Sequence, residues 1–361
     1  FGLKTIKTRH SQSSPNARST KSVPTTYFAD AYWPCKTHSI SLQRAFHQDS
    51  ISQLSNKIFR INQAIINSSI EEYSDLAYKF YNRLLKPHKT DEYKQIIVIP
   101  SKELYYLSFD AFLYERAQEL KYNHLDYLVN KNCISYKNRV ANNYFNNPTP
   151  EKLYLGIKPS FTNTEFTELN GAAQEINSIS KKLNGDILIN ENASKSELFK
   201  IISDYKILHF ASHSEPNKNN SAYSKIILSA ETGDTINSKL YAYEIQNSKL
   251  NTELVVLSTC NSGAGNLIKG EGLASLARSF NYAGAKSVLV SLWALPDFST
   301  SKIINSFFEE LSNKNKSSAL QQAKINYLKK SDEHLSNPIF WAGLIITGDK
   351  SSIEIKPEID S

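Results

Sequence analysis

Short blocks of consecutive apolar residues recur along the chain from residue 95 onward. They lie at 95–99, 153–157, 186–189, 206–210, 254–258 and 287–291, and a last block lies at 339–347. A short apolar run bounded by polar or turn-forming residues is typical of a strand that is buried on both faces. The pattern therefore predicts a sheet with both faces covered.

Helical periodicity fills the spaces between these blocks. Apolar residues fall three and four positions apart at 170–183, 194–202, 272–283, 303–311 and 319–328. Ser194 and Glu197 have the spacing of a capping box at the start of one of these segments. Alternating strands and helices predict an α/β protein with a mainly parallel sheet and helices on both faces.

The region before residue 86 has a different pattern. Residues 1–45 are rich in Ser, Thr, Pro and basic residues without apolar periodicity, which predicts a disordered tail or linker. Residues 46–85 carry apolar positions at helical spacing and predict a short helical segment. We expect the α/β domain to span 86–350 and a C-terminal tail to follow at 351–361.

Charge and hydropathy narrow the classes of function. The formal net charge is +7, but residues 1–45 hold seven basic residues and one acidic residue, so the rest of the chain is nearly neutral. It also lacks a basic-aromatic groove motif, and we expect it to bind no nucleic acid directly. The alternative is a nucleic-acid-associated scaffold that uses the basic tail. No run of 18 apolar residues exists, so no membrane span is predicted.

Three cysteines, Cys35, Cys133 and Cys260, indicate a reducing compartment. Their count is sparse and odd, which does not suit a disulfide framework, and their spacing excludes a CxxC motif. We therefore expect a cytoplasmic protein. The sequence begins with Phe1 and contains no Met, which we interpret as a piece of a longer chain.

Two predicted strands end in residues that can do chemistry. His213 follows the block 206–210, and Cys260 follows the block 254–258. Functional side chains of parallel sheets gather beyond the carboxyl ends of strands, and adjacent strands lie about 4.8 Å apart. An imidazole that accepts the proton of a thiol makes the sulfur a nucleophile. The pair therefore predicts nucleophilic catalysis.

The residues next to this pair fit the same chemistry. The backbone N–H groups of Ser214 and Cys260 can stabilise the oxyanion of a tetrahedral intermediate. Gly263 allows a tight turn after the nucleophile, because glycine tolerates positive φ. The alternative for Cys260 is a small buried apolar residue at a strand end.

The alternative at the same strand is a metal site. His209 and His213 have the i, i+4 spacing of zinc-binding helices. This segment is predicted to be a strand, however, and four residues of a strand span about 13 Å, which is too far to share one ion. We interpret His209 as a packed residue, and we expect no metal and no cofactor.

Several blocks of the chain resemble the CHAT family of the caspase-like clan of cysteine peptidases, which is related to separase and caspases. The resembling segments are 104–112, 208–213, 255–260, 270–278, 283–285, 291–293 and 337–343, within residues 70–348. Cys260 follows His213 by 47 positions, which also matches the separation of about 50 that is typical of caspase-type enzymes. The resemblance implies a caspase-like fold and a cysteine endopeptidase with His213 as base and Cys260 as nucleophile.

The resemblance also implies a setting for this activity. Family members usually carry upstream tetratricopeptide repeats that bind partners and gate the peptidase, and in bacteria they are associated with defence and regulated cell death. The alternative is a catalytically inactive caspase-like interaction module. The family often has Gly directly after the catalytic His, where this chain has the bulkier Ser214. The backbone N–H is retained, and the larger side chain would narrow the substrate pocket.

Three further residues are candidates for binding substrate. By resemblance, Trp293 would pack against a substrate side chain, and Asp297 or Glu271 would favour a basic residue at the cleavage site. The alternatives are that Trp293 belongs to the core and that the two acids only open their helices, where a carboxylate interacts favourably with the helix dipole.

Overall fold

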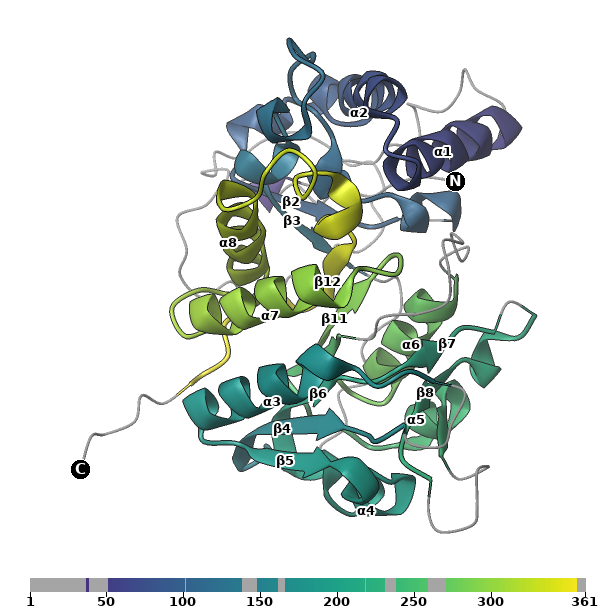
Figure 1. Cartoon of the computed structure of the whole chain (residues 1–361), viewed down its shortest axis with the longest axis vertical. Coiled ribbons are helices and arrows are strands. Elements are labelled where there is room, and N and C mark those ends of the chain that lie inside the picture. Colours follow the sequence, from purple (N-terminus) through teal and green to yellow (C-terminus); the bar gives the residue numbers. More distant parts are fainter. Residues whose placement is uncertain are drawn as a thin grey trace, which may run out of the picture.

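The computed structural model describes residues 37–38, 51–100, 102–137, 148–161, 166–217, 219–230, 238–258 and 271–355 (Figure 1). Within these residues one nine-stranded sheet forms the centre of the molecule. In spatial order its strands are β1 (Thr37–His38), β2 (Gln95–Val98), β3 (Cys133–Tyr136), β12 (Leu344–Gly348), β11 (Ser287–Ser291), β10 (Leu254–Leu257), β6 (Tyr205–Phe210), β4 (Lys152–Lys158) and β5 (Asp186–Ile189).

The strand directions divide this sheet into two halves. Every pair of neighbouring strands is parallel except β11 and β12, which are antiparallel. The strands from β11 to β5 therefore run one way and those from β12 to β1 run the other way. As a result, the carboxyl ends of β4, β6 and β10 lie at one edge of the sheet.

Helices cover both faces of the sheet (Figure 1). One group packs together along β4 and β3: α3 (Asn170–Leu183), α7 (Asp297–Leu311) and α8 (Lys316–Lys329). A second group includes α4 (Lys195–Ile201), α5 (Ala242–Asn247) and α6 (Glu271–Tyr282), with α6 against β11. The connections β4–α3–β5 and β10–α6–β11 move across the sheet in opposite directions, so right-handed crossovers place α3 and α6 on opposite faces.

A helical pair that precedes β2 in the chain lies on the β2 side of the molecule (Figure 1). It consists of α1 (Ile51–Ile66) and α2 (Ile70–Leu84), which pack against each other. The ring of Phe80 stacks on Phe112 at 5.7 Å, and the Tyr73 hydroxyl donates to the Ala111 carbonyl. These contacts join the pair to the short 3₁₀ turns around residues 102–130.

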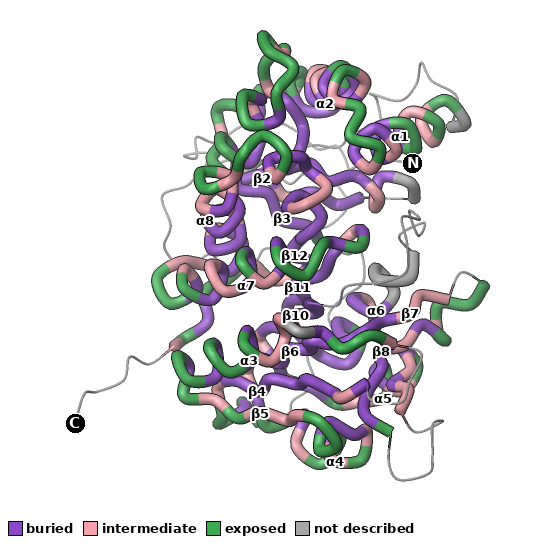
Figure 2. Tube along the Cα trace, viewed as in Figure 1, coloured by how far each residue is buried: buried purple, intermediate pink, exposed green. Residues whose placement is uncertain are grey.

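Burial follows the sheet (Figure 2). All residues of β10 and β11 are buried, and one continuous apolar cluster extends through both halves of the molecule. A smaller three-stranded antiparallel sheet follows His213: β7 (Ser214–Glu215), β8 (Lys225–Ile227) and β9 (Lys239–Tyr241). Within the described part of the chain, no helix has both the length and the apolar character needed to cross a bilayer.

The predicted α/β architecture is confirmed, and most predicted blocks correspond to observed elements. The prediction for the last block is wrong, because residues 339–347 do not form one strand. Pro338–Phe340 is a 3₁₀ turn in which the Asn337 side chain accepts from the Ile339 amide at 3.0 Å, and β12 starts only at Leu344.

The boundaries predicted for the tail, the helical segment, the α/β domain and the C-terminal tail stay predictions. Thr37 and His38 lie inside the segment 1–45 that the sequence assigns to a tail, and they pair with β2. The two helices α1 and α2 lie within the predicted helical segment 46–85.

Candidate active site

The carboxyl ends of β6 and β10 lie side by side. Phe210 pairs with Leu257 in parallel register, and the Ser258 amide donates to the Phe210 carbonyl at 3.1 Å. In the sequence, His213 comes three residues after Phe210, and Cys260 comes three residues after Leu257. The two predicted catalytic residues therefore each come three residues after a member of the same strand pair, Phe210 and Leu257. Cys260 itself, like Gly263, lies outside the described residues.

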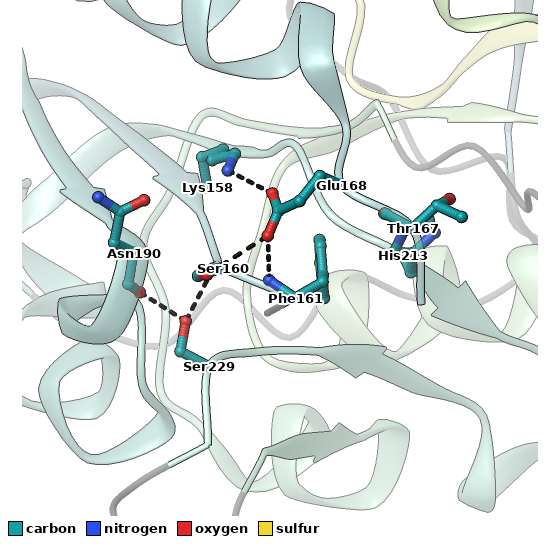
Figure 3. Close-up of polar contacts among 8 residues, drawn as sticks. All are labelled: Lys158, Ser160, Phe161, Thr167, Glu168, Asn190, His213 and Ser229. Carbon is teal, nitrogen blue, oxygen red and sulfur yellow. Dashed lines mark hydrogen bonds and ion pairs between the residues drawn. The ribbon is translucent and has the colours of Figure 1, made fainter. Parts of the chain in front are cut away.

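His213 is buried, with 2% of its surface exposed, and its ring orientation is defined by a hydrogen bond. Its Nε2 lies 2.7 Å from the backbone carbonyl oxygen of Thr167 (Figure 3). A carbonyl oxygen can only accept, so Nε2 carries a proton and donates it. In the neutral ring the lone pair is then on Nδ1, which makes Nδ1 the atom that can take up a proton.

Two aromatic side chains enclose the imidazole of His213. Phe166 stacks on it with ring centroids 5.2 Å apart, and Phe161 meets it edge-on at 4.6 Å. Both rings come from the segment between β4 and α3, which also supplies Thr167. Aromatic faces attract cations, so this enclosure restricts the ring and suits its protonated form as well.

Ser214 follows His213 directly and begins β7. It pairs with Ile226 in the antiparallel ladder, where the Ile227 amide donates to the His213 carbonyl at 2.9 Å. This pattern makes Ser214 and Ile226 a non-hydrogen-bonded pair, so the N–H of Ser214 points away from β8.

His209 lies in a buried polar network rather than in a metal site. Its Nδ1 lies 2.9 Å from the Tyr154 hydroxyl, and its Nε2 lies 3.0 Å from Ser258 Oγ and 3.1 Å from Glu175 Oε1. The Ser258 hydroxyl donates to the same Glu175 oxygen at 3.0 Å. Burial, and secondarily the charge of Glu175, raises the pKa of Tyr154 well above its ordinary value, so Tyr154 stays protonated and donates to Nδ1.

The Ser258, His209 and Glu175 side chains have the residue types of a hydrolase triad, but they are arranged differently. The Ser258 hydroxyl donates to the carboxylate, and both ring nitrogens of His209 already have partners. His209 is fully buried and Ser258 is 7% exposed. The network therefore ties α3 to β6 and β10 and offers no second nucleophile. Among the described residues, no cluster of three His, Cys, Asp or Glu side chains could hold a metal ion.

The three candidate substrate residues occupy different environments. Trp293 is 7% exposed, and its indole N–H donates to the Ile339 carbonyl at 3.1 Å, which favours the alternative that it packs in the core. Asp297 is exposed and is the first residue of α7. Glu271 is the first residue of α6, and its side chain lies outside the description.

Sequence reasoning missed Thr167, Phe161 and Phe166. A backbone carbonyl has no residue-type signature, so Thr167 could not be found from the pattern of side chains. The two phenylalanines flank a polar stretch without periodicity, and only the fold brings them to His213.

The curated relatives that match the chain are much longer than it. It is 33% identical to tetratricopeptide repeat protein 28 of Mus musculus over 109 residues, which is 30% of this chain and 4% of that protein. It is 22% identical to tetratricopeptide repeat protein 28 of Homo sapiens over 297 residues, which is 71% of this chain and 12% of that protein.

Similar solved structures include cysteine peptidases. Gingipain R, described as an Arg-specific cysteine proteinase, aligns with a TM-score of 0.45 and 11% identity over 78% of this chain and 68% of that one. Separase in the Saccharomyces cerevisiae separase–securin complex aligns with a TM-score of 0.41 and 14% identity over 68% of this chain and 14% of that one.

The family assignment comes from the sequence itself. The model of the CHAT domain matches residues 74–349, which is about three quarters of the chain and includes both strand ends described above. The observed sheet, with helices on both faces and a helical pair before it, is the caspase-like architecture that this assignment implies. The chain belongs to the CHAT domain family.

Proposed function

We propose that the chain is a cysteine endopeptidase that cleaves protein substrates, with His213 as the base and Cys260 as the nucleophile. Membership in the CHAT family supports the peptidase class. The observation that carries the proposal is the buried imidazole of His213, which is held by the Thr167 carbonyl at the strand end that neighbours the end of β10.

The reaction follows from the protonation state of His213. Its Nδ1 accepts the proton of the Cys260 thiol, and the resulting thiolate attacks the carbonyl carbon of the scissile peptide bond. The N–H groups of Ser214 and Cys260 stabilise the oxyanion of the tetrahedral intermediate. The imidazolium then gives its proton to the leaving amine, and water hydrolyses the thioester to regenerate the thiol. In this scheme Gly263 turns the chain after the nucleophile.

The rival proposal is an inactive caspase-like interaction module. A peptide that carries a thiol-reactive warhead separates the two. The endopeptidase predicts covalent labelling that is lost in Cys260→Ala and strongly reduced in His213→Ala. Labelling that persists in Cys260→Ala, or that never occurs with wild type, favours the interaction module.

Substrate preference is part of the proposal. If the carboxylate of Asp297 or Glu271 reaches a bound substrate, cleavage would favour Lys or Arg at the scissile position. A proteome-wide comparison of the cleavage products of wild type and Cys260→Ala tests this. A cleavage profile without preference for Lys or Arg rejects the acidic contribution.

We also propose that an upstream or partner module gates the peptidase in the cytoplasm, in a bacterial defence or cell-death pathway. The match to proteins named for tetratricopeptide repeats supports a repeat module as the gate. The folded part would act on proteins and bind no nucleic acid directly. Equal peptidase activity with and without upstream repeats in the same chain would reject gating.

A further inference from the structure

The carbonyl and the two aromatic rings that contact the ring of His213 all come from the segment between β4 and α3. It carries Phe161 at one end and Phe166 and Thr167 at the other. The described residues of this segment, 159–161 and 166–169, belong to no strand, so other contacts fix the position of the Thr167 carbonyl.

Glu168, the residue directly after Thr167, makes these contacts (Figure 3). Its Oε2 pairs with Lys158 Nζ at 2.9 Å, and Lys158 is the last residue of β4. Its Oε1 accepts from the Phe161 amide at 2.5 Å and from Ser160 Oγ at 3.3 Å. One carboxylate thus joins both ends of the segment to the end of β4.

A second set of bonds anchors the same end of the segment. The Ser160 amide donates to Ser229 Oγ at 3.1 Å, and Ser229 Oγ donates to the Asn190 carbonyl at 2.5 Å (Figure 3). The side chain of Lys158 is only 10% exposed, while that of Glu168 is 39% exposed. The ion pair is therefore partly shielded from water, and its lysine end is fixed in the molecule.

We propose that Lys158 and Glu168 form a positioning clamp that holds the Thr167 carbonyl against Nε2–H of His213. The carbonyl of Thr167 and the amide nitrogen of Glu168 belong to one planar peptide unit, so fixing Glu168 fixes the direction of that carbonyl. The clamp thereby holds Nε2 as the donor and Nδ1 as the acceptor. Its importance for catalysis rests on the proposed function, whereas its effect on the ring does not.

The charge state of Glu168 suits this role. Burial alone would raise its pKa, but hydrogen bonds from Lys158, the Phe161 amide and Ser160, together with the charge of Lys158, outweigh burial and lower the pKa. The carboxylate is therefore ionised at neutral pH, and the ion pair with Lys158 is present there.

The test measures the exchange of the Nε2 proton of His213 with solvent by NMR in the full chain. The signal is identified by its absence in His213→Ala. We expect exchange at least tenfold faster in Glu168→Gln and in Lys158→Met, and near wild-type exchange in Lys158→Arg, which keeps the charge. Thermal unfolding of each variant verifies that it folds.

The matched control is Glu244→Gln. Glu244 also pairs with a lysine, Lys195, at 2.9 Å, and it also accepts from a backbone amide, that of Tyr241, at 2.9 Å. This pair joins α4 to α5, so Glu244→Gln should weaken the fold similarly and leave the His213 proton unchanged.

Unchanged exchange in Glu168→Gln and Lys158→Met would overturn the clamp, and so would equal acceleration in Glu244→Gln. Peptidase assays on the same proteins separate this result from the proposed function. A wild type that shows the clamp but no cleavage contradicts the endopeptidase and not the clamp. If the wild type cleaves substrate, Glu168→Gln should lower kcat at unchanged KM.

Discussion

At the scale of single residues, the ring of His213, the proposed base, is held by one backbone carbonyl and enclosed by two aromatic side chains. His213 is recognisable because a histidine follows an apolar strand and a cysteine follows another. The partner of its Nε2 is a backbone carbonyl, and its ring neighbours are Phe161 and Phe166 from a segment with no periodic pattern. Only the fold brings these groups together.

A single substitution tests whether Trp293 packs in the core or binds substrate. Trp293→Phe removes the indole bond to the Ile339 carbonyl and part of the ring that fills the interior. We expect it to lower the free energy of unfolding by about 1–3 kcal/mol. Cleavage preference should stay unchanged. Urea unfolding and cleavage profiling measure the two effects, and an altered preference at unchanged stability would instead assign Trp293 to substrate binding.

The lowered pKa of Glu168 has a definite pH dependence. A carboxyl group with a lower pKa in the folded than in the unfolded chain stabilises the fold above its ordinary pKa, and this contribution is lost as pH falls through the folded value. We therefore expect the difference in unfolding free energy between wild type and Glu168→Gln to be present at pH 7 and to shrink as pH falls below the ordinary Glu pKa of about 4.3. Denaturant titrations across this range measure it, and a difference that grows on acidification would reverse the sign we assign.

At the scale of elements, the buried strands were predictable and the short ones were not. The continuous apolar runs of β10 and β11 identify them directly, because both faces of these strands are covered. The strands β7, β8 and β9 have two or three residues each, too few for a period to be visible. The start of β12 was misplaced because Pro338–Phe340 continues the apolar pattern while forming a turn.

The network around Glu175 connects three elements and should matter for stability. Glu175→Ala leaves the Nε2–H of His209 and the hydroxyl of Ser258 without their carboxylate in a buried site. We expect a loss of about 2–4 kcal/mol, because the variant removes two hydrogen bonds to a carboxylate and each such bond contributes about 1.5–3 kcal/mol. Thermal and urea unfolding measure this loss.

Thr252→Val is the matched control at the opposite end of β10. It removes one buried hydrogen bond, from Thr252 Oγ1 to the Tyr205 carbonyl, which should cost about 1 kcal/mol. Equal losses in Thr252→Val and Glu175→Ala would mean that the network adds nothing beyond a single hydrogen bond.

At the scale of the whole molecule, a buried ion pair joins parts of the chain that are 214 residues apart. Lys324 on α8 lies 2.8 Å from Asp110, and their side chains are 1% and 5% exposed. Burial raises the pKa of Asp110 in spite of the lysine beside it. No sequence pattern pairs these two residues, because their contact exists only after α8 has packed on the β3 half of the sheet.

Removing one partner of this pair should be more damaging than removing both. Lys324→Met leaves an unpaired buried carboxylate, and we expect a loss of about 3–5 kcal/mol, whereas Lys324→Met combined with Asp110→Leu should recover most of it. Lys79→Met in the exposed Lys79–Asp75 pair should change stability by less than about 0.5 kcal/mol. Unfolding of all three variants in urea tests the account, which fails if the single and double variants are equally unstable.

The proposed mechanism depends on a proton shared by His213 and Cys260, and the decisive measurement is the pH dependence of Cys260 alkylation by iodoacetamide. Burial raises the pKa of Cys133 to about 11, so Cys133 should react slowly, and Cys35→Ser removes the remaining thiol. We predict that alkylation of Cys260 stays fast well below pH 8 in wild type. In His213→Ala we expect the rate to fall with the ordinary thiol pKa of about 8.5. Identical pH profiles in the two proteins would contradict the claim.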